Sequence, residues 1–211
     1  MKIVKCFPNS SDNTFCLQAS VLSVLDYYFP NKFLEGEVIK STDYHPKFFS
    51  WCPRTVVWLD QLGLDVKLYS IGDYERIETE GLKYLKELKE QYFELEKKRG
   101  DYKYLPEIKV AISEMRNKNL WVKESLSVEK LRDELKGEQT LAIGKTVWEW
   151  LGGRYIEGPT HFVTVVKEYS PMVWLVQDPG GPTHIPNRKV NQYINNETIF
   201  PGDIILIKGK K

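Results

Sequence analysis

Cys16 stands where a run of small polar residues gives way to an apolar helical pattern, in the stretch NSSDNTFCLQAS from Asn9 to Ser20. Residues 11–14 are all types that cap helices, so we expect Cys16 in the first turn of a helix. Backbone N–H groups and the helix dipole favour a thiolate there, and they can hold a developing oxyanion. A thiolate attacks carbonyl carbon. A small buried apolar role for this cysteine stays open as the alternative.

Two of the three histidines occur in the same tetrapeptide, GPTH. His161, in the first copy, opens a predicted strand, GPTHFVTVV, which would hold its imidazole in a fixed place. His184, in the second copy, is followed within two residues by a proline, and we expect no strand to continue from it. His161 is therefore the better candidate for a general base that accepts the thiol proton.

Asp178 closes the next predicted strand, VWLVQDP, which forms a hairpin with the strand of His161. In such a hairpin the end of one strand lies beside the start of the other, so Asp178 and His161 are expected on neighbouring strands. A carboxylate there would accept the imidazole N–H and stabilise the imidazolium, as in nucleophile–base–orienter triads. A turn aspartate before Pro179 is the alternative.

Helices are predicted mainly in the first two thirds of the chain. An apolar stripe begins at Cys16, runs to Tyr28 at helical spacing and stops at Pro30, which predicts an N-terminal helix. The other predicted helices are PRTVVWLDQLG at 53–63, a long charged amphipathic helix from about Glu78 to Lys98, and SVEKLRDELKG at 127–137 with Ser127 as its cap.

Strands dominate the last third. β-branched and aromatic runs separated by Pro and Gly punctuation predict an antiparallel sheet. The predicted strands are LDVKLYS at 64–70, TLAIGKTV at 140–147, HFVTVVKEY at 161–169, VWLVQDP at 173–179 and DIILIKGK at 203–210. This order, helices first and sheet last, predicts an α+β fold with a cleft between the two halves.

Charge and cysteine usage exclude several classes of function. With 30 basic and 29 acidic residues, the chain has no electrostatic footprint for nucleic acid or an anionic membrane surface. The N-terminal residues lack a signal-peptide pattern and no stretch is apolar enough to span a bilayer, so we expect a cytoplasmic protein. Cys6, Cys52 and His45 lack the paired spacing of a zinc site, and nucleotide-binding motifs are missing from the sequence. We therefore expect no metal and no cofactor.

The three motifs SSDNTFCLQAS, THFVTVV and VWLVQDPGG together resemble the papain-like cysteine peptidases, and most closely the C39-like branch related to bacteriocin-processing peptidases. The resemblance covers the order of elements over nearly the whole chain. It implies a single papain-like domain over residues 1–211, with an N-terminal helical half packed on a C-terminal antiparallel β-sheet. It also implies that Cys16, His161 and Asp178 are nucleophile, base and orienting carboxylate, and that residues from about 78 to 119 are a helical insertion.

The resemblance also points to an oxyanion donor. The family has a glutamine six positions before the cysteine, where this chain has Ser10. Asn9 is the nearest amide, and it would serve if the loop before Cys16 holds one extra residue. Gln18 lies inside the predicted helix and is less suited. We expect Asn9 to donate to the oxyanion together with the backbone N–H of Cys16, and Ser10 remains the alternative.

The resemblance implies a cysteine peptidase or related thiol hydrolase that acts on a peptide or protein substrate through an acyl-enzyme. A thiol acyltransferase and a non-catalytic papain-like binding or scaffold protein are the alternatives. Trp148 and Trp150, shortly before His161, would wall a substrate groove, form a partner patch or lie in the core.

Overall fold

The computed structural model describes residues 4–10, 14–46, 48, 50–88, 102–137, 139–147, 160–170, 173–179, 181–186 and 203–211. Within these ranges, the side chains of residues 145–147, 160, 169, 170, 173, 178 and 181–186 lie outside the description. Trp148 and Trp150, two candidate groove residues, lie outside the described residues altogether.

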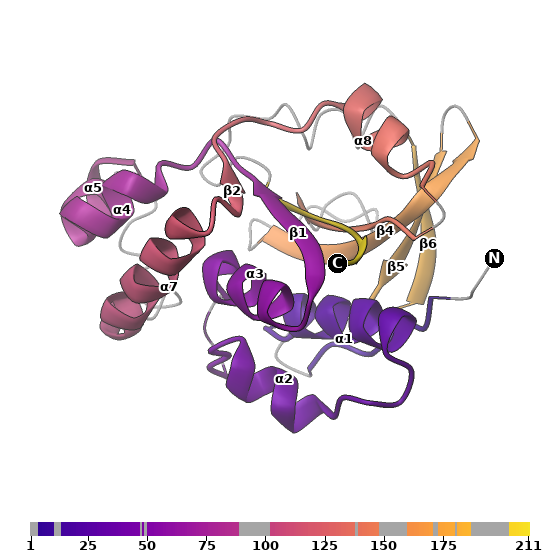
Figure 1. Cartoon of the computed structure of the whole chain (residues 1–211), viewed down its shortest axis with the longest axis horizontal. Helices are drawn as coiled ribbons and strands as arrows, with labels where there is room; N and C mark the ends of the chain where they lie inside the picture. The colour runs from indigo at the N-terminus through magenta and orange to yellow at the C-terminus, as the bar shows by residue number, and fades with distance from the viewer. Residues whose placement is uncertain are drawn as a thin grey trace.

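Helices and strands follow one another in a mixed order (Figure 1). The helices are α1 (Cys16–Tyr28), α2 (Glu35–Ser41), α3 (Cys52–Gln61), α4 (Tyr74–Glu80), α5 (Leu82–Leu88), the 3-10 turn η1 (Tyr102–Tyr104), α7 (Leu105–Asn117) and α8 (Val128–Glu134). The strands are β1 (Leu64–Tyr69), β2 (Trp121–Val122), β3 (Leu141–Val147), β4 (Thr160–Ser170), β5 (Val173–Asp178), β6 (Gly181–Pro186) and β7 (Ile204–Lys210). The predicted α+β class is confirmed at this level.

The described strands form one sheet with the order β2-β1-β7-β3-β4-β5-β6. Neighbouring strands are antiparallel, as the sequence predicts, except for the short parallel pair of β1 with β2. Strand β7 lies between β1 and β3, so it joins the early strands of the chain to the late ones.

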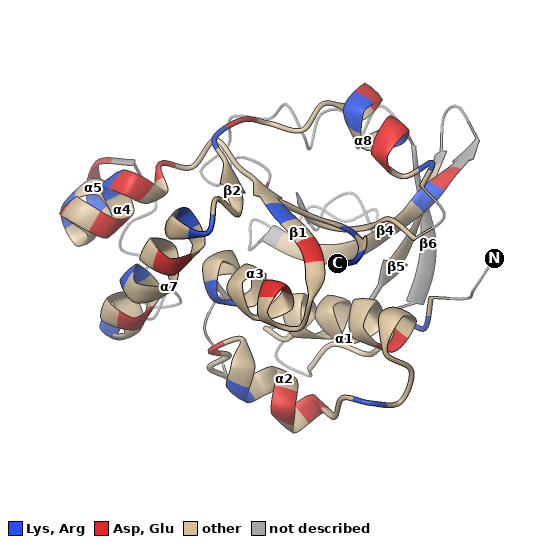
Figure 2. Ribbon diagram, viewed as in Figure 1, with Lys and Arg blue, Asp and Glu red and all other residues tan. Residues whose placement is uncertain are grey.

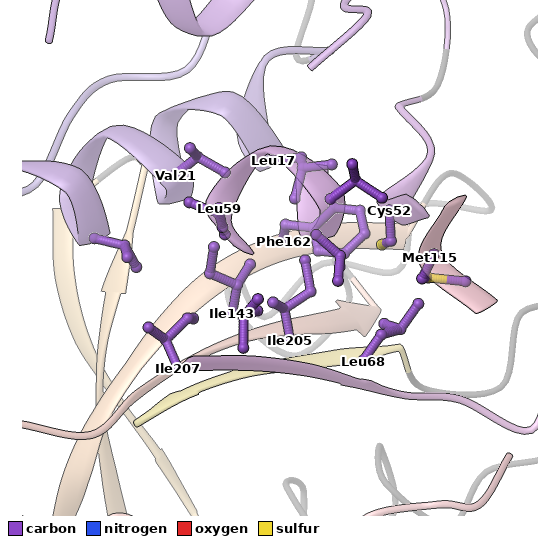
Figure 3. Packing of buried hydrophobic residues seen from close by; sticks show 14 of the residues in the cluster. Leu17, Val21, Cys52, Leu59, Leu68, Met115, Ile143, Phe162, Ile205 and Ile207 are labelled. Atoms are coloured by element: carbon purple, nitrogen blue, oxygen red, sulfur yellow. The ribbon is translucent and has the colours of Figure 1, made fainter. Parts of the chain in front are cut away.

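The sheet is covered on both faces. One buried cluster joins α1, α3 and α7 to the sheet through residues such as Ile143, Phe162 and Ile205 (Figure 3). A second cluster joins α8 to the other face through alternate residues, among them Val163 and Val165. In Figure 1, α8 lies across the sheet from α1 and α3. Alternation along β4 therefore sorts its side chains between the two faces.

Helix α1 is the most deeply buried helix because its apolar stripe matches the helical period. Leu17, Val21 and Leu25 are almost completely buried, and each such side chain contributes roughly 1.5–3 kcal/mol of transfer free energy. Figure 2 shows charge spread over α4, α5, α7 and α8, whereas α1 carries a single charged residue, Asp26. The predicted N-terminal helix is confirmed.

Three hydrogen bonds fix the direction of α1 on the sheet. At its C-terminal end, the Tyr28 hydroxyl donates to the carbonyl oxygen of Ile207 at 3.2 Å and also to that of Gln139, just before β3. Nearer its N-terminal end, the Thr164 hydroxyl of β4 donates to the carbonyl oxygen of Ser20 at 3.3 Å. Because β3 and β4 are antiparallel, Gln139 is level with the later part of β4, so α1 runs in the same direction as β4 and Cys16 lies toward the end of the sheet where β4 begins.

The prediction of one long helix from about Glu78 to Lys98 is wrong at its start. Helix α4 ends at Glu80, and Gly81 adopts φ +59°, a left-handed conformation that breaks the helix at low cost only for glycine. Helix α5 then begins at Leu82. Residues 89–98 of the predicted helix lie outside the described residues.

The sequence predicts that no strand continues from His184; the second GPTH copy nevertheless lies in a strand, β6, which ends two residues later at Pro186. His184 lies in β6, opposite Leu175 of β5. The prolines at 182 and 186 fit this strand because β6 is an edge of the sheet, where a missing backbone N–H costs no ladder hydrogen bond. The two histidines of the repeated tetrapeptide therefore both lie in strands.

Candidate active site

Cys16 is the first residue of α1, as predicted, and 7% of its surface is exposed. The residue before it, Phe15, caps the helix without a side-chain hydrogen bond of its own. The first N–H groups of a helix have no intrahelical acceptor and carry the positive end of the helix dipole. The Cys16 thiol therefore lies at the positive end of the α1 dipole.

Asn9 closes the loop that leads into this helix. Its side-chain Oδ1 accepts hydrogen bonds from the backbone N–H groups of Ser10 and Phe15, both at 2.9 Å. The Ser10 Oγ in turn accepts from the backbone N–H of Thr14 at 3.2 Å. The phenyl side chain of Phe15 cannot accept a hydrogen bond at the helix start. The Asn9 side chain, six positions earlier, accepts from the Phe15 backbone N–H instead.

The other end of the Asn9 amide has no such partner. Because Oδ1 already accepts two N–H groups, the orientation of the amide is defined and Nδ2 is its donor end. Nδ2 is buried and has no hydrogen-bond partner among the described residues. A buried donor without an acceptor costs about 1–3 kcal/mol, so its presence beside the Cys16 helix start requires an explanation.

Asn9 also ties the Cys16 loop to the sheet. Its backbone N–H donates to the carbonyl oxygen of Pro179 at 3.3 Å, directly after the last residue of β5. The loop before α1 and the end of β5 are therefore held together, although they are separated by most of the chain.

His161 and Asp178 occupy neighbouring strand ends, as predicted. His161 is the second residue of β4, is 2% exposed and lies opposite Thr146 of β3. Thr164 of β4 pairs with Gln177 of β5, and continuing this register by one residue brings Asp178 opposite Val163, two residues from His161. The backbone of Asp178 is described, whereas its side chain lies outside the description.

The structure does not join Cys16 to His161. No hydrogen bond links the thiol and the imidazole in the described part of the chain. Phe162 and Thr164 face α1, so regular alternation puts His161 on the opposite face of β4, with Val163. His161 is the second residue of β4, so its imidazole could reach the Cys16 thiol only around the beginning of that strand.

Gln18 is not an oxyanion donor, in agreement with its place inside the helix. Its Nε2 donates to the Thr42 hydroxyl at 3.2 Å, and its Oε1 accepts from the Ser50 hydroxyl at 3.1 Å. This fully buried amide anchors the connection between α2 and α3 to the first turn of α1. Sequence reasoning missed this role, although a glutamine within an apolar helix is itself a signal of a specific buried partner.

Cys52 begins α3, as Cys16 begins α1, but its surroundings differ. Its Sγ lies 3.9 Å from Oδ2 of Asp203, a buried carboxyl just before β7. Burial, reinforced by the nearby Asp203 and Cys52, raises the pKa of the Tyr74 hydroxyl well above its ordinary value. This cysteine therefore lies in an acidic, enclosed environment.

The described residues contain neither a metal-binding cluster nor a membrane-spanning helix. There, no group of three or more His, Cys, Asp or Glu side chains lies close enough to hold a metal ion. None of the helices in these same segments is long and apolar enough to cross a membrane.

Comparison with known proteins adds no assignment. No protein-family model and no curated protein matches this chain.

Proposed function

We propose that the chain is a papain-like, C39-like cysteine peptidase or a closely related thiol hydrolase that cleaves an amide bond in a peptide or protein. Cys16 is the nucleophile, His161 the base, Asp178 the residue that orients the imidazole and Asn9 the side-chain donor of the oxyanion hole. The proposal covers a single catalytic domain whose charged helical segment from about 78 to 119 is an insertion.

One observation carries the proposal. The unpartnered Nδ2 of Asn9 belongs to an amide whose other end is fixed on the N–H of Phe15, directly before Cys16. A buried donor held at the start of a cysteine-bearing helix is what a tetrahedral oxyanion requires and what a purely structural loop does not. The bond from Asn9 to Pro179 supports the same reading, because it holds this donor at the strand end that carries Asp178.

The reaction proceeds by acyl transfer. The Cys16 thiolate attacks the substrate carbonyl carbon, forming a C–S bond and placing negative charge on the carbonyl oxygen. Asn9 Nδ2 and the backbone N–H of Cys16 donate hydrogen bonds to that oxygen. His161, protonated by the thiol, gives its proton to the leaving amine and then takes one from the water that hydrolyses the acyl-enzyme. Asp178 accepts the imidazole N–H throughout.

The experiment that tests the proposal is competitive labelling of the three thiols with iodoacetamide at about pH 6, followed by peptide mapping. Cys6 is the most exposed of the three, and Cys16 and Cys52 are buried. If access alone decided, Cys6 would react first. The proposal predicts that Cys16 reacts much faster than either, because only a stabilised thiolate is reactive at this pH. Equal labelling, or Cys6 or Cys52 first, would contradict it.

A non-catalytic binding protein is the second candidate. The observation in its favour is the alternation of β4, which assigns His161 to the face opposite α1. In that case Cys16 is a small buried residue and Asn9 only closes its loop. The labelling order then follows exposure, so the same experiment separates the two candidates.

A further inference from the structure

The two residues directly before Cys16 are held by two side chains from different parts of the chain. Asn9 Oδ1 accepts from the backbone N–H of Phe15 at 2.9 Å. Tyr44, in the connection between α2 and α3, makes the other contacts. Its hydroxyl and that of Thr14 are hydrogen-bonded at 2.9 Å, and its ring meets the Phe15 ring edge-on, with centroids 5.1 Å apart. One tyrosine therefore contacts both residues that lead into the proposed nucleophile.

The end of α2 determines where Tyr44 lies. The C-cap residue of the helix, Thr42, is followed by Asp43 with φ +50°, a left-handed conformation that aspartate adopts more often than most residues. The Tyr44 backbone N–H then donates to the carbonyl oxygen of Ile39 at 3.2 Å, which is the six-to-one bond of a Schellman helix end. A defined helix end therefore places this side chain beside the start of α1.

The same connection also binds α1 just after Cys16. Helix α2 packs against α1 (Figure 1). The Thr42 hydroxyl accepts from the amide of Gln18 at 3.2 Å, and the Ser50 hydroxyl donates to that amide at 3.1 Å. Cys16 is thus flanked along the chain by residues 14 and 15, which contact Tyr44, and by Gln18.

The position of Phe15 is important for the proposed oxyanion hole. Its backbone N–H holds the Asn9 amide, whose Nδ2 is the proposed side-chain donor. Its carbonyl group shares a planar peptide unit with the backbone N–H of Cys16, which is the proposed backbone donor. A rotation of this one residue would therefore turn both donors at once. A displacement of about 1 Å can slow an enzymatic reaction by roughly a hundredfold.

We propose, on the basis of the function proposed above, that Tyr44 is a positioning residue for the reaction of Cys16. By holding Thr14 and Phe15, it keeps the Asn9 and Cys16 donors directed at the same point. Tyr44 acts through these residues and takes no part in proton transfer. Loss of its hydroxyl should therefore slow a reaction that forms an oxyanion more than one that forms none.

The test uses Tyr44→Phe, which removes the hydroxyl and keeps the ring on Phe15. Two rates are measured by mass spectrometry of the Cys16 peptide: acylation by p-nitrophenyl acetate, which forms an oxyanion, and alkylation by iodoacetamide, which does not. The ratio of acylation to alkylation should fall about tenfold, because both donors remain but are less well aligned.

Thr14→Val removes the other hydroxyl of the same hydrogen bond and should lower the ratio by a similar factor. The double variant should fall no further than either single variant, because the shared bond is lost only once. Losses that add in the double variant would show that the two hydroxyls act separately, which would contradict the proposal.

Tyr28→Phe is the matched control. It removes a hydroxyl at the other end of α1, where Tyr28 donates to the carbonyl oxygen of Ile207 at 3.2 Å. Tyr28 is 7% exposed and Tyr44 9%, so the two variants should lose similar stability, but Tyr28→Phe should leave the ratio unchanged.

The outcomes separate this role from the proposed function. If the parent chain is acylated at Cys16 and Tyr44→Phe keeps the parent ratio, or Tyr28→Phe lowers it equally, then Tyr44 is not a positioning residue and the proposed function stands. A parent chain that forms no acyl-enzyme at Cys16 would overturn the proposed function, and the role of Tyr44 with it.

Discussion

Two helices of this protein begin with a cysteine, and the polar groups beside the two helix starts differ. Helix α1 begins at Cys16 after Phe15, and α3 begins at Cys52 after Trp51, and neither aromatic cap residue makes a side-chain capping bond. Both thiols therefore lie at the positive end of a helix dipole. The Cys16 helix start is held by an amide, whereas the Cys52 thiol faces a carboxyl.

The difference teaches that a helix start does not by itself make a cysteine reactive. A carboxylate 3.9 Å from Cys52 Sγ disfavours the thiolate and accepts the thiol proton in a hydrogen bond. At the Cys16 helix start, the Asn9 amide presents an unpartnered donor, which suits an anion. The four predictions that follow test this contrast, from the largest expected effect to the smallest.

Removing the Asn9 donor alone should have the largest effect. Asn9→Asp keeps the oxygen that accepts from Ser10 and Phe15, but it replaces the NH₂ group. The rate at which p-nitrophenyl acetate acylates Cys16 should fall about a hundredfold or more, because that reaction forms an oxyanion. Alkylation by iodoacetamide forms no oxyanion, so it should fall by a smaller factor, caused only by the added negative charge near the thiol. Both rates are followed by mass spectrometry of the Cys16 peptide.

Ser10→Ala is the control for this prediction, since Ser10 is the alternative donor. It should leave the ratio of acylation to alkylation close to that of the parent chain. If the ratio stays constant in Asn9→Asp and falls in Ser10→Ala, then the oxyanion donor has been assigned to the wrong residue.

The two GPTH histidines provide the next test. In the proposed site, His161→Ala should slow alkylation of Cys16 at about pH 6 by tenfold or more, because the thiolate would lose its imidazolium partner. His184→Ala should not, since His184 lies within the edge strand β6, opposite Leu175. Asp178→Ala should fall between them, because it orients the imidazole without taking the proton. The measurement is the alkylation rate against pH, with folding checked by circular dichroism. A profile that moves with His184→Ala and not with His161→Ala would reverse the assignment.

Cys52 should become more reactive when its carboxyl neighbour is neutralised. Asp203→Asn removes the negative charge beside Sγ, so the labelling of Cys52 at about pH 8 should rise several-fold. It should stay below that of Cys16, because Cys52 is only 2% exposed. Asp65→Asn, an exposed change on β1, is the control. Unchanged Cys52 labelling in Asp203→Asn would mean that burial alone keeps this thiol inert.

The smallest effect concerns Tyr74, whose pKa is raised above its ordinary value of 10.0 by burial, with Asp203 and Cys52 adding to the shift. Above about pH 10 the unfolded chain releases this proton and the folded chain does not, so folded stability is lost as pH rises. Tyr74→Phe removes that contribution. Its free energy of unfolding in urea should fall less steeply with alkaline pH than that of the parent chain, and an identical slope would contradict the assignment.

Local patterns in the sequence were sufficient to predict the helices and strands that carry the candidate residues. The apolar period of α1, the cap at Ser127, which accepts from the backbone N–H of Lys130, and the β-branched run of β4 are each determined by neighbouring residues. The antiparallel pairing of β4 and β5 follows from how close the two strands lie in the sequence. The strand positions of His161 and Asp178 were therefore predictable.

Contacts between distant segments were not predictable in the same way. Cys52 and Asp203 are 151 residues apart, and no local pattern brings them together. The residues on both sides of Gly81 favour a helix by composition. The helix nevertheless ends there, because this one residue adopts a positive φ. The strand of His184 forms despite two prolines because its position at the sheet edge, a tertiary property, removes their cost.

The central place of β7 also sets the order of events during synthesis. Among the described strands, β7 alone pairs with both β1 and β3, and it also accepts the hydrogen bond from Tyr28 at the end of α1. On the ribosome, α1 and β1 emerge long before residues 204–210. Until β7 is made, β1 and β3 have no strand between them, and their edges stay unpaired on that side. The segment that carries Cys16 is thus translated well before the strand that completes its support.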